Sequence, residues 1–434
     1  MNAYAHFLPP PYIEPRTGQV PSSGTETLPR YTRRNTIAQP LIRREPIEHV
    51  FQLVDGRRAW AILKLYSSAK SAKSIPTFYE KEKITGTLEI DAVKGDSSIR
   101  IITIEITGRI TTSPKIEDNH TFLTVTHTIW SKSSDVVRVP SASESATGSK
   151  LVGRCAWPFS IPLPRKAKEI GGDVESHPLP ETFRESDVHA SVQYEVTVHV
   201  ARGKLRTDNW IRAPFAYVPS SRPGLPSELR RLACEHNAPV PGPDVDPLGW
   251  SLSQGAVTRG LVFRSREAEV HCSLSLANPL CYTRGSTIPC FLKLSSRDSQ
   301  ALDWISNPNS IQLNLRRSVK YCVAATFGRT DIAWKKYYKD ICTASWRPSR
   351  TIPSDTHNWY LEGEIKLPKD LKPSSKIGYF DISYSVDLCP FDLTGFQSSE
   401  DVEFLLSQPV EIVTMHPKAS RHVSYSPPPA YDYS

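Results

Sequence analysis

Apolar and polar residues alternate along much of the chain. In 192–200 every second position is a valine or a tyrosine, and the residues between them are polar. A period of two with one apolar side is typical of a half-buried β-strand. The same alternation occurs in five further runs: 84–90, 102–107, 270–276, 311–315 and 380–388. Because no stretch between these runs repeats convincingly at 3.6 residues, the pattern predicts an all-β body.

The spacing of these runs predicts two domains. Regular short strands that are separated by polar or proline-rich connections, such as 141–150 and 165–187, indicate an antiparallel β-sandwich. The predicted division of the chain is a tail at 1–45, a first sandwich at 46–219, a linker at 220–254, a second sandwich at 255–414 and a tail at 415–434. The linker is rich in proline and glycine, with a short helical turn expected at 227–234.

The two predicted sandwiches share an order of features. The segment 159–164 resembles 363–368, and each is followed by a strand that carries a tyrosine. Each half then ends in a similar apolar segment, at 214–218 and at 409–413. We therefore expect a diverged tandem of one immunoglobulin-like antiparallel β-sandwich.

Both tails carry a Pro-Pro-x-Tyr motif in sequence without periodicity, which predicts disordered, proline-rich ends. The first motif is Pro9, Pro10, Pro11 and Tyr12. The second motif consists of Pro428, Pro429, Ala430 and Tyr431. With 37 Pro and 17 Tyr in 434 residues, random placement predicts about 0.1 matches. Two matches by accident are not expected, although clustering of prolines in the tails weakens that argument.

A Pro-Pro-x-Tyr segment has the chemistry of a WW-domain ligand. Consecutive prolines favour polyproline II, so little conformational entropy is lost when the peptide binds between aromatic rings. The WW-binding residues predicted here are Pro9, Pro10, Pro11, Tyr12, Pro428, Pro429 and Tyr431. The alternative is that the proline-rich ends have no partner.

The formal net charge of +8 and a pI near 9.0 permit anionic partners such as an anionic membrane. The basic residues Arg165, Lys166 and Lys168 are candidates for contact with lipid or acidic tails, or they simply keep a loop solvated. No basic stripe with interleaved aromatic residues is present, so we expect no nucleic-acid partner.

The sequence contains neither an apolar run of about 18 residues nor a secretory signal pattern. The eight cysteines form no Cys-x-x-Cys pair and are predicted to be buried free thiols in a reducing compartment. We therefore expect a soluble intracellular protein.

No enzyme motif is present: there is no phosphate-binding glycine loop, no Gly-x-Ser-x-Gly elbow and no His-Glu-x-x-His helix. We expect no catalytic residues, no cofactor and no metal site. His199 and His271 are predicted to be solvated, whereas His127 is predicted to be a core histidine. Three tryptophans are expected to fill cores: Trp60, Trp130 and Trp346.

Several segments together resemble the arrestin superfamily, and specifically the fungal arrestin-related proteins. They are 85–90, 101–109, 157–164, 179–183, 192–196 and 277–285, in an order that covers about residues 47 to 414. One departure is Glu181, which stands where the family usually has a second proline. No residues matching the phosphate sensor or polar-core triad of visual and β-arrestins are found.

The resemblance implies an arrestin fold and a role as an adaptor. Members with Pro-Pro-x-Tyr motifs bind the cytoplasmic tails of transporters or receptors and recruit HECT-type ubiquitin ligases through WW domains. The implied outcome is cargo ubiquitination and endocytosis, by a cytoplasmic protein that is recruited to the plasma membrane or endosomes. The alternatives left open are an arrestin-fold signalling scaffold and a retromer-like scaffold that recruits no ligase.

Overall fold

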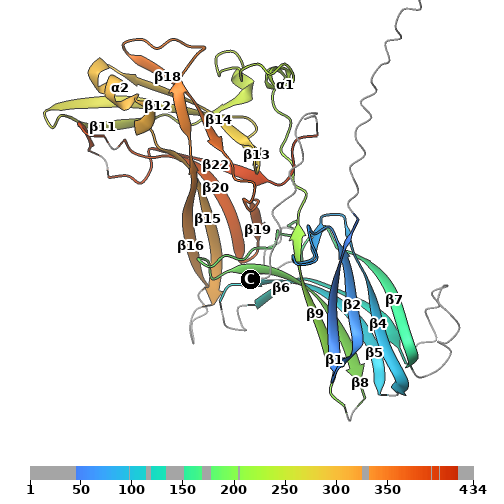
Figure 1. The fold of residues 1–434 in the computed structure, drawn as a ribbon. Coiled ribbons are helices and arrows are strands. Elements are labelled where there is room, and N and C mark those ends of the chain that lie inside the picture. Colours follow the sequence, from blue (N-terminus) through green and yellow to red (C-terminus); the bar gives the residue numbers. More distant parts are fainter. Residues whose placement is uncertain are drawn as a thin grey trace, which may run out of the picture. The chain divides into compact units, whose positions relative to one another are not determined.

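Residues 47–218 form two β-sheets in the computed structural model (Figure 1). The model describes residues 45–96, 98–113, 119–132, 151–168, 177–203, 206–324, 332–391, 393–399 and 401–418. One sheet has the order β1-β2-β4-β7 and the other has the order β3-β9-β8-β5-β6. Their strands are β1 (Ile47–Asp55), β2 (Arg58–Ser67), β3 (Thr77–Tyr79), β4 (Lys83–Asp96), β5 (Ile99–Thr111), β6 (Asn119–Ser131), β7 (Leu151–Pro162), β8 (Ser191–Arg202) and β9 (Asn209–Val218).

A second pair of sheets follows between residues 250 and 413. One sheet has the order β17-β18-β14-β12-β11-β21, with β10 paired to β12, and the other has the order β13-β22-β20-β15-β16, with β19 paired to β20. Their strands are β10 (Trp250–Leu252), β11 (Ala256–Val262), β12 (Arg266–Ala277), β13 (Cys281–Thr283), β14 (Thr287–Ser296), β15 (Leu313–Ala324), β16 (Ile332–Thr343), β17 (Ser345–Pro348), β18 (Asn358–Lys366), β19 (Ser375–Ile377), β20 (Phe380–Leu388), β21 (Phe396–Ser398) and β22 (Leu406–Val413). The predicted fold class, two tandem antiparallel β-sandwiches, is confirmed.

The alternation seen in the sequence places the core. In β8, Val192, Tyr194, Val196, Val198 and Val200 are all at most 2% exposed, and the residues between them are not buried. In β20 the same alternation buries the residues from Phe380 to Leu388 that were expected to face inward. Period-two patterning fixes which face of a strand is buried, because a shift of one residue would turn every side chain to the other side.

Two structural details recur in both sandwiches, as expected for a tandem. The hydroxyl of Tyr194 donates to the carbonyl of Pro180 at 2.6 Å, and that of Tyr384 donates to the carbonyl of Lys372 at 2.6 Å. In each sandwich a short strand also pairs in parallel with the last strand: β3 with β9, and β13 with β22.

The predicted helical turn in the linker is present as α1 (Glu228–Glu235). The Ser227 hydroxyl caps it by accepting from the Arg230 backbone N–H. Arg230 donates from Nη1 to the Asn278 carbonyl at 2.7 Å and from Nη2 to the Gly249 carbonyl. With the 3₁₀ turn η2 (Pro247–Gly249) and β10, this segment therefore adds to the second sandwich.

The changeover between the sandwiches occurs over a few residues before α1. The Ser220 N–H donates to Glu80 of the first sandwich at 2.8 Å. The next N–H, of Ser221, donates to Thr414 of the second sandwich at 3.1 Å. The backbone N–H groups of these two neighbouring residues therefore donate to different sandwiches.

The second sandwich also contains α2 (Ser299–Ile305) and the 3₁₀ turn η3 (Pro308–Ser310). Asp298 caps α2, and the helix buries Ala301, Leu302 and Ile305 against the sandwich. Within the residues described, no helix has the length and apolar character needed to cross a membrane.

One core prediction is wrong. His127 is exposed, although it pairs with the buried Ile104 across β5 and β6. The reason is that β6 is the outer strand of its sheet, where the apolar face is not fully covered. The three tryptophans agree with their prediction, because Trp60, Trp130 and Trp346 all pack against the core.

The cysteine prediction is only partly right. All eight thiols are free, but only Cys272, Cys290 and Cys322 are buried, and Cys234 on α1 is exposed. Burial raises the pKa of the Cys272 thiol to about 12. A periodic pattern identified the buried side of β12, whereas the helix carrying Cys234 exposes all of its side chains in part.

Candidate functional site

The predicted peptide motifs lie outside the described residues. This applies to all seven predicted WW-binding residues: Pro9, Pro10, Pro11, Tyr12, Pro428, Pro429 and Tyr431. They therefore stay predictions. The site that the structure does describe is a cluster of buried charges where the two sandwiches meet.

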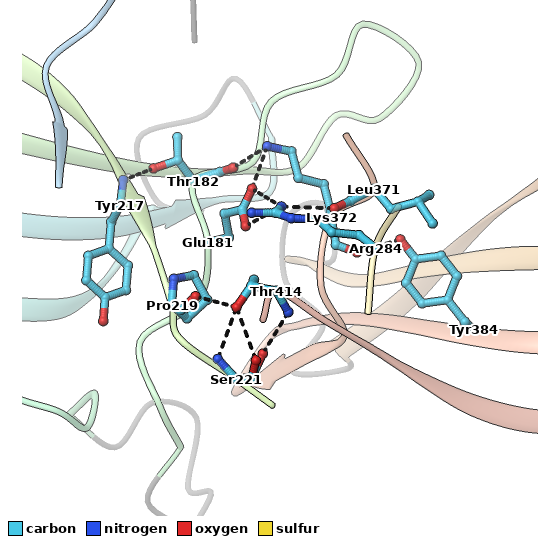
Figure 2. A network of polar contacts seen from close by, with 10 residues as sticks. All are labelled: Glu181, Thr182, Tyr217, Pro219, Ser221, Arg284, Leu371, Lys372, Tyr384 and Thr414. Carbon is cyan, nitrogen blue, oxygen red and sulfur yellow. Dashed lines mark hydrogen bonds and ion pairs between the residues drawn. The ribbon is translucent and has the colours of Figure 1, made fainter. Parts of the chain in front are cut away.

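Glu181 is at the centre of this cluster (Figure 2). Its side chain is 3% exposed and accepts from Nη1 of Arg284 at 2.9 and 3.1 Å. Lys372 approaches the same carboxylate with Nζ at 3.2 Å. Arg284 and Lys372 belong to the second sandwich, so one carboxylate of the first sandwich is held by two cations of the second. A carboxylate with such partners is compensated for the loss of water.

Local backbone contacts set the position of Glu181. The preceding carbonyl, of Pro180, accepts the buried hydroxyl of Tyr194. The following residue, Thr182, accepts the backbone N–H of Tyr217 on its hydroxyl at 2.9 Å, and its carbonyl accepts Nζ of Lys372 at 3.0 Å. The carboxylate therefore projects from a loop that is fixed on both sides, and Figure 2 shows the contacts on the Thr182 side.

The two cations are held equally firmly. Arg284 directly follows β13, and its backbone N–H donates to the Val413 carbonyl at 3.0 Å. Its guanidinium also donates to the Leu371 carbonyl at 3.0 Å. The carbonyl of Lys372 accepts the hydroxyl of Tyr384, and burial raises the pKa of that hydroxyl far above its usual range. Both cations are thus presented by backbone that the second sandwich anchors.

The same loop sends two more carboxylates to the second sandwich. Glu185 forms a two-pronged pair with Arg317 of β15, with 2.7 Å between Oε1 and Nη1. Burial disfavours the charged guanidinium, but the Glu185 carboxylate outweighs this and raises the pKa of Arg317. Asp187 accepts from the hydroxyl of Tyr337 at 3.4 Å and lies 3.8 Å from Nζ of Lys339.

Apolar contact accompanies these ion pairs. Phe183, between the carboxylates, is 0% exposed, and its ring lies 5.3 Å from that of Phe380 on β20. The guanidinium of Arg317 lies 6.0 Å from the centre of the Phe183 ring. We name residues 179–187 the acidic loop, because it carries Glu181, Glu185 and Asp187 to basic partners on the second sandwich.

A second set of contacts joins the linker to the end of β22. The Thr414 hydroxyl donates to the Pro219 carbonyl at 2.7 Å and accepts from the Ser221 N–H (Figure 2). The N–H of Met415 donates to the Ser221 carbonyl at 2.9 Å. The junction is therefore held by backbone as well as by charge.

The chemistry of the cluster is that of an ion-pair lock. Its carboxylates face cations, and a buried pair costs several kcal/mol, about 3–5, when one partner is removed. No group of three or more His, Cys, Asp or Glu side chains in the described parts of the chain is arranged to hold a metal ion.

The other candidate residues are dispersed. Arg165, Lys166 and Lys168 have exposed side chains near the acidic loop in sequence but not within the cluster. His199 accepts or donates at 2.9 Å to Asp208 and stacks on Trp210, so it is engaged rather than simply solvated. His271 lies 3.0 Å from Glu269 and is largely exposed, as expected.

Sequence reasoning missed the cluster, although one signal pointed to it. Glu181 stands out as a charged residue in the apolar segment Leu179-Pro180-Glu181-Thr182-Phe183, where the resembled family usually has proline. Its partners are 103 and 191 positions away, so no local pattern could identify them.

Comparison with known proteins assigns no family. No protein-family model matches the chain, and no curated protein matches it significantly.

Proposed function

We propose that this chain is an arrestin-like adaptor that recruits a WW-domain HECT-type ubiquitin ligase to membrane-protein cargo. The tails carry the ligase-binding residues Pro9, Pro10, Pro11, Tyr12, Pro428, Pro429 and Tyr431. The two-sandwich body binds the cytoplasmic tail of a transporter or receptor, and the cargo is ubiquitinated and endocytosed. The adaptor itself is cytoplasmic and is recruited to the plasma membrane or endosomes.

The observation that carries the proposal is the presence of one Pro-Pro-x-Tyr motif beyond each end of an all-β body. In the body, the acidic loop of the first sandwich forms ion pairs with three cations of the second sandwich. Two motifs on one body allow simultaneous engagement of tandem WW domains, and such bivalence raises avidity about 10²–10⁴-fold when geometry permits.

Two features of the body support cargo binding. Outer strands such as β1, β6 and β16 offer backbone donors and acceptors to an extended peptide. The exposed basic side chains of Arg165, Lys166 and Lys168 favour an acidic peptide or an anionic membrane.

The deciding experiment is binding of the full-length protein to the tandem WW domains of a HECT ligase. We expect Tyr12→Ala and Tyr431→Ala each to weaken binding, and the double variant to abolish it, with the fold intact by circular dichroism. Tyr4→Ala and Tyr433→Ala are matched controls, because these tyrosines lie in the same tails without two preceding prolines. Equal binding by the double variant would leave a ligase-free scaffold as the better account.

A further inference from the structure

An apolar groove of about 720 Å³ lies beside α1 in the second sandwich. One wall comes from the linker, with Leu225 and Leu229, and the opposite wall comes from Pro279 and Leu280. Leu248 of η2 stands at its edge and is 88% exposed. Large apolar side chains are costly to leave in water, at roughly 25 cal/mol per Å² of exposed surface. The groove therefore has the character of a surface that another segment covers.

Several leucines at and beside the groove are exposed. Leu225 is 56% exposed, Leu229 is 45% exposed and Leu232, one turn further along α1, is 44% exposed. Helix α1 buries no residue at all. An eight-residue helix with leucines spaced three apart and no buried face is stabilised when a partner packs on it.

The described chain ends beside this groove. The N–H of Glu411 on β22, the last strand, donates to the carbonyl of Leu280, a residue of the groove wall. Nη1 of Arg222 donates to the carbonyl of His416, near the end of the described chain. Arg222 is three residues before Leu225 of the groove wall. A Cβ on Gly224 would lie 3.6 Å from Pro279, so the two walls are in contact at this end.

The remaining chain has the reach and the composition to fill the groove. Residues 419–434 extend up to about 50 Å at ~3.3 Å per residue, starting from a chain that is bonded at His416 to Arg222, three residues before the groove wall at Leu225. Their apolar residues include Val423, Tyr425 and three successive prolines, and Arg421 complements the carboxylate of Glu228 on the groove wall. Extended proline-rich segments bind shallow apolar grooves at low entropic cost.

We propose that the groove is the docking site of the chain's own segment 419–434. Docking competes with WW domains for Pro428, Pro429 and Tyr431, so the C-terminal motif is less available than the N-terminal one. The docking itself is independent of the proposed ligase function, whereas the competition rests on it.

The docking is tested by photo-crosslinking in the full-length protein, with benzoylphenylalanine in place of Tyr425. We expect intramolecular crosslinks to peptides that contain Leu225–Leu229 or Leu248, and their loss in the Leu229→Asp/Leu248→Asp variant. Both side chains are exposed, so the fold should tolerate the change. Crosslinks elsewhere, crosslinks only between molecules, or crosslinks to the groove from a probe at Tyr12 instead would overturn the proposal.

The competition is tested in the Tyr12→Ala background, where only the C-terminal motif can bind. Leu229→Asp/Leu248→Asp should tighten WW binding about 3- to 10-fold, toward the affinity of a free peptide of residues 419–434, because the binding-competent fraction rises. The control is Val50→Asp/Val54→Asp, which places the same two charges on β1 at residues that are each 52% exposed. Unchanged affinity alongside groove crosslinks would refute the competition, and failure of all variants and of the peptide to bind WW domains would refute only the proposed function.

Discussion

Tyr194 and Tyr384 each donate a hydrogen bond to a backbone carbonyl, one in each sandwich, but the charged side chains next to these carbonyls have opposite signs. In the first sandwich the hydroxyl fixes the carbonyl just before Glu181. In the second sandwich the hydroxyl fixes the carbonyl of Lys372 itself. The two anchored segments then meet, with Nζ of Lys372 3.2 Å from the Glu181 carboxylate.

This difference shows how two similar sandwiches form an asymmetric pair. Two identical corners would bring like charges together, which is destabilising in a buried site. Because the tyrosine-anchored segment carries an acid, Glu181, in the first sandwich and a base, Lys372, in the second, the two segments form an ion pair. The second sandwich adds Arg284, which binds the same Glu181 carboxylate, and Arg317, which pairs with Glu185 of the acidic loop.

Glu181→Gln is the substitution expected to destabilise this pairing most. The change leaves the buried Arg284 and the partly buried Lys372 without this counter-ion, so we expect the free energy of unfolding to fall by about 3 kcal/mol. Urea denaturation followed by tryptophan fluorescence measures it. Adding Lys372→Met should recover part of the loss, because one uncompensated cation is removed.

The matched control is Glu269→Gln in the second sandwich. Glu269 pairs with Arg259 at 2.9 Å, but both side chains are largely exposed. The urea midpoint should not move, since exposed pairs contribute little. If both substitutions had the same effect, burial would not explain the strength of the Glu181 cluster.

A smaller effect is expected from Tyr194→Phe and Tyr384→Phe. Each leaves a buried carbonyl without its donor, at a cost of about 1–2 kcal/mol. Each should also be non-additive with Glu181→Gln by at least about 0.5 kcal/mol, because the tyrosines position the members of one ion cluster. Double-mutant cycles measure this coupling, and strict additivity would separate the corners from the cluster.

A further effect concerns alkaline pH and distinguishes the sandwiches. Burial raises the pKa of Cys272 and of Cys281 to about 12, and of Cys342 to about 11. Since the unfolded thiols lose their protons near pH 9, the unfolded chain binds fewer protons above that pH and stability falls as pH rises. Each fully buried thiol contributes a slope of up to about 1.4 kcal/mol per pH unit.

The second sandwich carries these thiols, whereas the first has only Cys155. Hydrogen exchange at pH 10 relative to pH 7 should therefore accelerate more in β12 and β14 than in β5 and β8, after correction for intrinsic exchange. Cys272→Ala is expected to reduce that pH dependence. Equal acceleration in both sandwiches would contradict the assignment.

The fold was predictable because it depends on local alternation. The valines of β8 and the apolar positions of β20 are buried as the period of two requires. The prediction for His127 is wrong because alternation does not show whether a strand lies at the edge of its sheet. That is decided by pairing with distant strands.

The buried cluster could not be predicted for the same reason. Glu181 and Arg317 are separated from their partners by more than a hundred positions, and an isolated charge in sequence normally indicates a solvated surface. Glu181 was noticeable only as a departure from the expected proline. The peptide motifs show the opposite case, because a four-residue pattern needs no tertiary partner to be recognised.

The partner of the backbone N–H changes from the first sandwich at Ser220 to the second sandwich at Ser221, and this has a consequence for exchange of gene segments. A recombination breakpoint between these two codons would transfer α1, η2 and β10 together with the sandwich whose edge they complete. A breakpoint at codon 254, where the proline-rich composition ends, would separate Trp250 from Phe291, whose rings lie 6.3 Å apart. The inheritable module of the second half therefore begins about thirty residues earlier than composition indicates.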